Sequence, residues 1–241
     1  MTIQAGTDET GRIRRAVLVH GAGGGGWEWN VWRRVFAAHG FQVEALDLRP
    51  TDAGLESTGL DDYAGQVRDA LTKSPGPSVL VGASLGGLLA MACAEAADAL
   101  VLVNPLPPAP WSERLPRRES PGVVPWRRDA RLASTRRALP DSDDATALFA
   151  FRRWRDESGA VLRQAHAGLL LDAPTCPTLC IASAQDEDVP PDLTAEFARA
   201  WEADLLRVAS PGHVGPLLGR DAAPVATQAA AWVSTRRLSA R

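Results

Sequence analysis

The sequence predicts an α/β protein with a mostly parallel, doubly wound sheet flanked by helices. Short, continuously apolar segments recur along the chain, as expected for strands that are buried on both faces. Amphipathic helical segments alternate with them, and parallel strands require such crossovers. Most of the apolar segments end in turns rich in glycine, proline or polar residues. The 241 residues fit one large domain.

The overall composition is that of an ordinary globular protein. Hydrophobic residues make up 45% of the chain and charged residues 23%. The formal net charge of -3 argues against nucleic acid as the main partner. The first residues lack the order of a signal peptide, and no apolar segment approaches the roughly 18 residues of a membrane span. We therefore expect a cytoplasmic protein that acts on a small molecule without a membrane partner; the oligomeric state is left open.

The three cysteines, Cys93, Cys176 and Cys180, lie within apolar segments. They form no Cys-x-x-Cys motif, and no histidine stands at metal-ligand spacing from them. We therefore expect buried, reduced thiols, and neither a metal site nor a bound cofactor.

The first part of the chain alternates strands and helices. Ala16–Val19 is an apolar strand that leads into the glycine-rich segment His20–Gly26. A helical stripe at Trp32–Phe36 follows, and Phe41–Leu46 is the next strand. Leu60–Leu71 is an amphipathic helix whose first turn is acidic, as the helix dipole prefers.

A serine stands at the corner between a predicted strand and a predicted helix. Val79–Val81 is a buried strand that ends at Gly82-Ala83-Ser84-Leu85-Gly86, and an apolar helical pattern begins at Leu85. Glycines two residues before and after the serine leave room for a sharply bent backbone. The first free N–H groups of the helix point toward the place where negative charge would develop on an attacked carbonyl.

This pentapeptide, in its strand–turn–helix context, resembles the nucleophile elbow of the α/β-hydrolase family. A second signature is His20-Gly21 with further glycines directly after the first strand. In that family this loop supplies one backbone N–H of the oxyanion hole, which the resemblance assigns to Ala22, beside the N–H of Leu85. Gly21 and Gly23 would let the backbone approach the substrate closely. The loop has neither the Gly-Lys-Ser/Thr ending of a phosphate-binding loop nor a dinucleotide fingerprint.

Three more strands and a last helix follow the serine. Ala99–Val103 and Pro177–Ala182 are apolar strands, and Leu205–Ala209 is the last strand. The chain closes with a helix at about Ala222–Arg237. Two further helical patterns lie between the first two of these strands (Ala145–Trp154 and Val161–Leu171).

The irregular segment 105–174 stands where the α/β-hydrolase family carries its lid. The resemblance implies a helical cap at 105–174, inserted after the strand that ends near Val103, over a core made of residues 1–104 and 175–241. Such a cap would cover the sheet edge that holds the serine. Two tryptophans of this segment are candidates for substrate binding in the apolar part of the pocket, or for the interior of the cap (Trp111 and Trp126).

The α/β-hydrolase family completes its site with an acid and a histidine. It carries the acid after the strand before last, three residues before a Val-Pro pair, which the resemblance assigns to Asp186; Asp188 is the alternative. It carries the histidine after the last strand, where this chain has Gly212-His213. The other histidines all precede the acid and lie in the glycine-rich segment, at a helix end and in the cap (His20, His39 and His166). The order Ser84, Asp186, His213 is that of the family.

Arginine is concentrated between Glu113 and Arg137. This segment has eight arginines and three acids (Arg114, Arg117, Arg118, Arg127, Arg128, Arg131, Arg136 and Arg137; Glu113, Glu119 and Asp129). Charge runs usually form a solvated surface. The alternative is recognition of an anionic or carrier-linked substrate, through a carboxylate, a coenzyme A phosphate or an acidic carrier protein.

These residues together predict a serine hydrolase that cleaves a carboxylic ester or thioester of a small organic molecule. His213 would take the proton of Ser84 as general base, Asp186 would hold the imidazole, and an acyl-serine intermediate would form. A serine here argues against the relatives that open epoxides or remove halide with an aspartate. Two alternatives stay open. One is a lyase or cyclase without an acyl-enzyme, which needs a further acid or base from the cap; the other is a non-catalytic ligand-binding protein.

Overall fold

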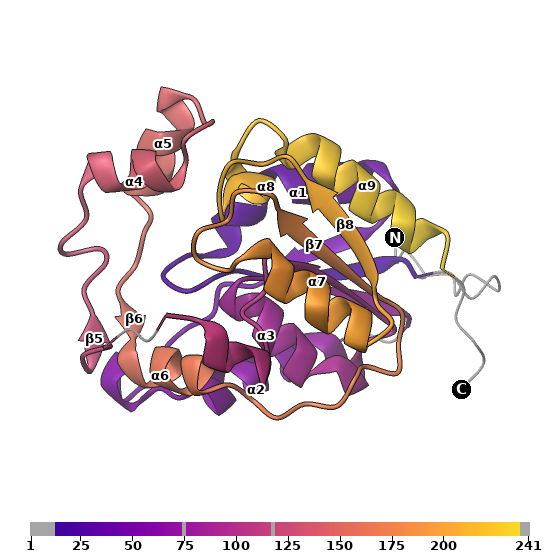
Figure 1. The fold of residues 1–241 in the computed structure, drawn as a ribbon, viewed down its shortest axis with the longest axis horizontal. Coiled ribbons are helices and arrows are strands. Elements are labelled where there is room, and N and C mark those ends of the chain that lie inside the picture. Colours follow the sequence, from indigo (N-terminus) through magenta and orange to yellow (C-terminus); the bar gives the residue numbers. More distant parts are fainter. Residues whose placement is uncertain (1–12, 74–75, 117–118, 237–241) are drawn as a thin grey trace, which may run out of the picture.

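The centre of the molecule is a six-stranded sheet in which all neighbouring strands run parallel (Figure 1). The computed structural model describes residues 13–73, 76–116 and 119–236. The strand order is β2-β1-β3-β4-β7-β8. The strands are β1 (Arg15–Val19), β2 (Gln42–Ala45), β3 (Ser78–Ala83), β4 (Ala99–Val103), β7 (Thr178–Ser183) and β8 (Asp204–Val208). The predicted doubly wound α/β architecture is therefore confirmed.

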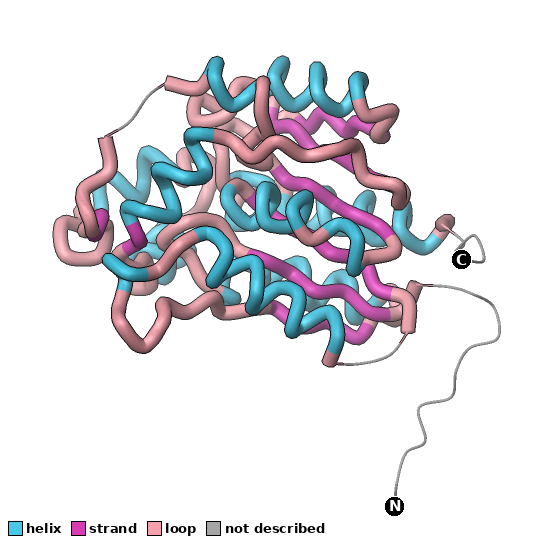
Figure 2. The backbone as a smooth tube through the Cα atoms, turned by 90° about the horizontal axis from the view of Figure 1, so that it is seen from below, coloured by secondary structure: helices cyan, strands magenta, loops and turns pink. Residues whose placement is uncertain are grey.

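Helices cover both faces of this sheet (Figures 1 and 2). On one face lie α2 (Leu60–Thr72), α3 (Leu85–Ala92) and α7 (Pro191–Ala200), and on the other lie α1 (Asn30–Ala38), α8 (Gly215–Leu218) and α9 (Ala222–Ser234). Neighbouring residues of a strand face opposite sides, so Leu80 packs with the first set of helices and Val79 and Val81 pack with the second. Because both sides are buried, the strands are continuously apolar rather than alternating.

The segment between β4 and β7 lies on the side toward which β7 and β8 point (Figure 1). It contains η4 (Trp111–Arg114), β5 (Val123–Val124), α4 (Leu132–Ala138), α5 (Asp144–Phe151), β6 (Glu157–Ser158) and α6 (Gly159–Ala167). The helical patterns predict α5 and α6, but not α4 or the antiparallel β5–β6 pair, because such short elements leave little periodic pattern. The division into a core and a cap at 105–174 stays a prediction.

Three short 3₁₀ helices complete the described chain: η1 (Gly26–Trp29), η2 (Leu55–Ser57) and η3 (Ala94–Ala96). Within the described ranges, no helix combines the length and the apolar character that a membrane crossing needs. Two expectations fall partly outside these ranges. They are the expectation about a signal peptide, which concerns the N-terminal residues, and the expected end of the last helix at Arg237.

Two of the three cysteines are buried free thiols, as the sequence predicts. Cys93 and Cys180 are buried, whereas Cys176 is partly exposed. Burial raises the pKa of Cys93 to about 11 and that of Cys180 to about 12. Both thiols therefore stay protonated at neutral pH, and neither has the lowered pKa of a nucleophilic cysteine.

Candidate active site

Ser84 occupies a strained turn between β3 and α3. Its backbone has φ 53° and ψ -120°, a conformation that residues with a side chain rarely adopt. The turn depends on its glycines. A Cβ on Gly82 would lie 2.1 Å from the carbonyl oxygen of Gly86, and a Cβ on Gly86 would lie 2.2 Å from that of Val19. The structure therefore forms the predicted strand–serine–helix corner, and Ser84 lines a cavity there.

His213 is held by a buried carboxylate. Its Nδ1 lies 2.7 Å from Oδ2 of Asp186, whose side chain is 1% exposed. The other oxygen of Asp186 accepts the backbone N–H groups of Asp188 and Val189. Burial favours the neutral imidazole, but the hydrogen bond and charge of Asp186 outweigh it and raise the pKa of His213. Asp188 is exposed, so this geometry favours Asp186 of the two acids that the sequence offers.

Ser84 and His213 line the same cavity, which has a volume of about 650 Å³ and is mostly apolar. Its other walls come from the glycine loop (His20–Gly26) and from the segment between β4 and β7, and include Gly21, Ala22, Trp126 and Leu162. No hydrogen bond joins the Ser84 hydroxyl to His213 in the described structure. Catalytic hydrogen bonds of this kind often form only when substrate binds. The catalytic roles of Ser84, Asp186 and His213 stay predictions.

Asn104 fixes the loop that carries His213, and the sequence analysis did not single it out. Its Nδ2 donates to the Ser183 hydroxyl (2.8 Å) and to the backbone carbonyl of His213 (2.6 Å). Its Oδ1 accepts the backbone N–H of Ser183 (2.8 Å). An asparagine directly after the buried strand β4 is the one sequence signal that points to it.

The sequence predicts that Ala22 and Leu85 supply the two N–H groups of an oxyanion hole. Ala22 lines the cavity with Ser84, and Leu85 is the first residue of α3. Neither N–H donates to an acceptor in the part of the chain that the structure describes. Both groups are thus free for a substrate oxygen, and their role stays a prediction.

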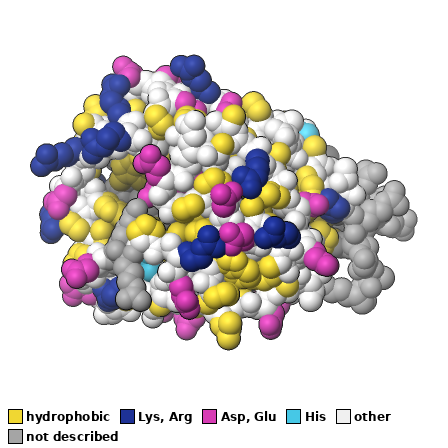
Figure 3. Space-filling view, viewed as in Figure 1, with side chains coloured by type: hydrophobic (Ala, Val, Ile, Leu, Met, Phe, Trp, Pro, Cys, Tyr) yellow, Lys and Arg dark blue, Asp and Glu magenta, His cyan; other side chains and the backbone are white. Residues whose placement is uncertain are grey.

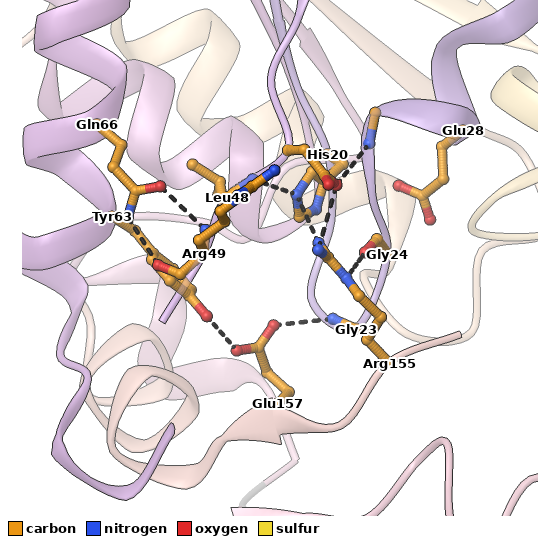
Figure 4. Close-up of polar contacts among 12 residues, drawn as sticks. His20, Gly23, Gly24, Glu28, Leu48, Arg49, Tyr63, Gln66, Arg155 and Glu157 are labelled. Atoms are coloured by element: carbon orange, nitrogen blue, oxygen red, sulfur yellow. Dashed lines mark hydrogen bonds and ion pairs between the residues drawn. The ribbon is translucent and has the colours of Figure 1, made fainter. Parts of the chain in front are cut away.

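The first residue of the glycine loop, His20, is a neutral histidine that bonds to the backbone around it (Figure 4). Nε2 of His20 accepts the backbone N–H of Leu48 (3.0 Å) and lies 3.1 Å from Nη2 of Arg155. Because Nε2 accepts, Nδ1 carries the hydrogen, which it donates to the carbonyl of Gly21 (2.7 Å). Burial, together with the charge of Arg155, lowers the pKa of His20 to about 4. His20 is therefore a structural group and not a proton carrier at neutral pH.

Two residues at the start of β6 tie the segment between β4 and β7 to the glycine loop: Arg155, two positions before the strand, and Glu157, its first residue (Figure 4). Arg155 donates its backbone N–H to the carbonyl of Gly23 (2.8 Å) and its Nε to that of Gly24 (2.6 Å). Glu157, which is buried, accepts the N–H of Gly23 (2.9 Å) and the hydroxyl of Tyr63 (2.8 Å). These contacts fix the backbone of the two residues that follow Ala22, and the sequence gives no local signal for them.

Arg155→Ala is expected to lower kcat about 10- to 100-fold, because a displaced glycine loop would misplace the predicted oxyanion donor, the N–H of Ala22. The effect on KM should be smaller, since Arg155 does not line the cavity. The matched control is Arg153→Ala, which removes an exposed arginine that stacks on Phe149 without contacting the loop. Steady-state kinetics of both variants check this; equal losses of kcat in the two would contradict it.

The four predicted substrate-binding residues differ in where they lie relative to the cavity. Gly21 and Trp126 line the cavity. Gly23 lies just behind it with φ 66°, and a Cβ there would be 2.4 Å from the Trp126 ring. The prediction that Trp111 lines the cavity is corrected, because Trp111 is not among the cavity residues. Its ring packs against Phe197 and Trp201 at centroid distances of 6.0 and 6.2 Å.

The arginine-rich segment is largely a surface of mixed charge (Figure 3). Several of its arginines form ion pairs: Arg114 with Glu196, Arg128 with Asp129 and Arg136 with Asp144. Arg127 is exposed and does not line the cavity. Of the arginines that the structure describes, Arg131 alone lines the cavity. Two acids of the same segment, Glu119 and Asp129, also line it. Arg117 and Arg118 lie outside the described residues.

Two further ionisable residues of the cavity, His166 and Glu28, come from outside the arginine-rich segment and the predicted triad. His166 lines it from α6, and its Nδ1 is bonded to the carbonyl of Leu162 (2.8 Å). Glu28 lines it from η1 and is buried. A charged residue between two tryptophans, directly after a glycine-rich loop, is the signal that marks Glu28.

One donor set of the site has the composition of a metal site. Ligand atoms of Asp186, Asp188 and His213 lie within 4.8 Å of one another. However, Nδ1 of His213 and Oδ2 of Asp186 already bond to each other at 2.7 Å. One nitrogen of His213 and one oxygen of Asp186 are therefore already bonded within the chain, and the expectation of a site without metal or cofactor stays a prediction.

Solved structures with the same fold include several enzymes. A pyrethroid hydrolase from Sphingobium faniae JZ-2 is 19% identical, with a TM-score of 0.73 over 93% of this chain and 98% of its own. Tomato methylketone synthase I is 17% identical, with a TM-score of 0.72 over 93% and 99%. A methylesterase from Arabidopsis is 16% identical, with a TM-score of 0.68 over 92% and 97%. At these identities the likeness establishes the fold alone.

The sequence itself identifies the family. No curated protein is similar enough to be matched. The model of the alpha/beta hydrolase family, in contrast, matches residues 16–228, which is most of the chain and includes Ser84, Asp186 and His213. The predicted resemblance is thus confirmed, and the chain belongs to the alpha/beta hydrolase family.

Proposed function

We propose that the protein is a serine hydrolase that cleaves a carboxylic ester or thioester of a small molecule through an acyl-serine intermediate. The observation that carries the proposal is the arrangement within one cavity. A serine on a strained corner shares this cavity with His213, whose ring bonds to buried Asp186 at 2.7 Å. The shared fold of a pyrethroid hydrolase and a methylesterase is compatible with ester hydrolysis.

In the first half-reaction, Oγ of Ser84 attacks the carbonyl carbon while Nε2 of His213 accepts the hydroxyl proton. Nδ1 keeps its hydrogen in the bond to Asp186, so the carboxylate stabilises the imidazolium. The carbonyl electron pair moves onto oxygen, where the N–H groups of Ala22 and Leu85 stabilise the charge. Collapse expels the alcohol or thiol, which takes the proton from His213 and leaves the acyl-serine.

In the second half-reaction, water replaces the alcohol. His213 takes a proton from the water as its oxygen attacks the acyl-serine, and the same two N–H groups stabilise the second oxyanion. Collapse breaks the bond to Oγ of Ser84, which recovers its proton from His213. The products are a carboxylic acid and the free enzyme.

The cavity favours a neutral substrate with an apolar part. Its volume of about 650 Å³ suits a small organic molecule. Leu106, Leu115 and Trp126 contribute apolar walls. The charge of Arg131 is accompanied by those of Glu119 and Asp129, so the described lining offers no net positive surface to an anion.

A substrate panel tests this directly. Neutral aryl esters of increasing acyl length are expected to have a kcat/KM at least about tenfold above that of acyl-coenzyme A thioesters. Arg131→Gln should change this ratio little, and so should Arg127→Gln, the matched arginine outside the cavity. A preference for the thioesters that Arg131→Gln abolishes and Arg127→Gln leaves intact would instead establish recognition of an anionic substrate.

A further inference from the structure

Glu28 places a buried carboxyl group beside the predicted triad. It lines the same cavity as Ser84 and His213, and the residue is 3% exposed. Its Oε2 accepts the backbone N–H of Gly21 at 3.2 Å. Gly21 in turn packs on Ser84, since a Cβ there would lie 3.3 Å from Cβ of Ser84. Glu28 therefore lies on the side of Ser84 where the glycine loop provides the predicted oxyanion donor.

The glycine loop makes room for this carboxyl group (Figure 4). A Cβ on Gly24 would lie 2.4 Å from Oε1 of Glu28, so a larger residue there would displace the carboxyl group. Within the described structure Glu28 forms no ion pair, and its one hydrogen bond is the one from Gly21 to Oε2, so Oε1 has no hydrogen-bond partner. A buried carboxylate without a paired cation is costly, which favours the protonated form.

The charges around Glu28 do not reverse this preference. Burial raises its pKa to about 8, whereas the N–H of Gly21 and the charges of His213 and Arg155 act in the opposite direction. His213 acts from the loop after β8 and Arg155 from the residues before β6. At neutral pH the carboxyl group is mostly neutral. Because Oε2 accepts from Gly21, the hydrogen belongs on Oε1.

We propose that Glu28 is a fourth catalytic side chain, which donates a hydrogen bond from its neutral carboxyl group to the substrate oxygen that becomes negative. The role rests on the ester hydrolysis proposed above and adds a donor to the N–H groups of Ala22 and Leu85. As Ser84 attacks, the carbonyl electron pair moves onto this oxygen and the hydrogen bond strengthens. The proton stays on Glu28 throughout, and the electron pair returns when the tetrahedral intermediate collapses.

Ionisation of Glu28 removes the donor and puts a negative charge beside the developing oxyanion. Activity therefore falls as pH rises through about 8, where Glu28 loses its proton. His213 does not produce such a fall, because the neutral imidazole that acts as base becomes more populated at higher pH. An alkaline decrease is thus the signature of Glu28.

The test measures kcat/KM for a neutral p-nitrophenyl ester from pH 6 to 9.5 in wild type, Glu28→Gln and Glu157→Gln. Glu157 is the matched control: its buried carboxylate also binds the glycine loop, through Gly23, but does not line the cavity. Wild type and Glu157→Gln are expected to lose about tenfold in kcat/KM between pH 7.5 and 9.5. Glu28→Gln keeps an N–H donor and cannot ionise, so its profile should be flat there.

Thermal unfolding provides a readout that does not depend on turnover. The pKa of Glu28 is raised by folding, so the stability it contributes is present at pH 4.5 and is lost as pH rises to about 8. The Tm of wild type relative to Glu28→Gln should therefore fall across this range.

Two results overturn the role of Glu28 alone: an alkaline decrease in Glu28→Gln equal to that of wild type, or a Tm difference that is independent of pH. Both leave Ser84-dependent hydrolysis intact. Turnover that survives Ser84→Ala overturns the proposed function and, with it, the role of Glu28.

Discussion

Replacement of Ser84 by alanine is expected to lower kcat/KM for ester hydrolysis by about 10⁴-fold or more, because it removes the hydroxyl on which the proposed acyl intermediate forms. The fold should persist. The turn is held by the backbone carbonyl of Ser84, which accepts the N–H groups of Gly87 (2.9 Å), Leu88 (3.2 Å) and Leu106 (3.0 Å). Alanine keeps all three bonds, so the loss is chemical and not structural.

Steady-state kinetics with a p-nitrophenyl ester check this expectation. The matched control is Ser134→Ala, which removes a serine of the same cavity that lies in α4 and not at the elbow. It should keep most of the activity. A Ser84→Ala variant that still turns over, or a Ser134→Ala variant that is equally inactive, would show that the nucleophile has been assigned to the wrong residue.

Asp186→Asn is expected to lower kcat by about 10³- to 10⁴-fold. Asp186 accepts hydrogen bonds from His213, Asp188 and Val189 through its two oxygens. Asparagine has one oxygen, so its amide must face either the two backbone N–H groups or the imidazole. If the amide N–H faces the ring, Nδ1 must accept from it and the hydrogen of His213 moves to Nε2. A protonated Nε2 cannot accept the serine proton.

Two measurements distinguish this effect from a general disturbance of the loop: the pH dependence of the residual activity, and the activity of a variant at the neighbouring acid, Asp188. Asp186 raises the pKa of His213, so the residual activity of Asp186→Asn should extend to lower pH than that of wild type. Asp188→Asn keeps the backbone N–H that bonds to Asp186 and should cost much less activity. A larger loss in Asp188→Asn than in Asp186→Asn would place the catalytic acid at position 188, and comparable losses would contradict the assignment to Asp186 alone.

The sequence predicts the central sheet well because its strands are buried on both faces. Val79–Val81 and Ala99–Val103 are continuously apolar for that reason, and each lies in the sheet as predicted. Between β4 and β7 this pattern is missing. The two-residue strand β5 (Val123–Val124) pairs with Glu157 and Ser158, about half the length of the segment further on, and no local periodicity signals such a contact.

The same distinction applies to the candidate site. Ser84 and His213 are found from the sequence because each stands in a locally recognisable turn. Asn104 is not, because its bonds reach residues 79 and 109 positions away. The ring of Trp111 packs on α7 and does not line the cavity. The sequence does not predict this, because an aromatic residue in an irregular segment carries no information about which cluster it joins.

The most direct test of the account is to locate a covalent adduct. Wild-type protein treated with a fluorophosphonate should gain one phosphonyl group, and tandem mass spectrometry should find it on Oγ of Ser84. Ser84→Ala should stay unlabelled, and His213→Ala should be labelled far more slowly, because the base that activates the serine is lost. Wild-type protein that hydrolyses esters while Ser84 stays unmodified, or that carries the label on another residue, would contradict the proposed nucleophile and the mechanism built on it.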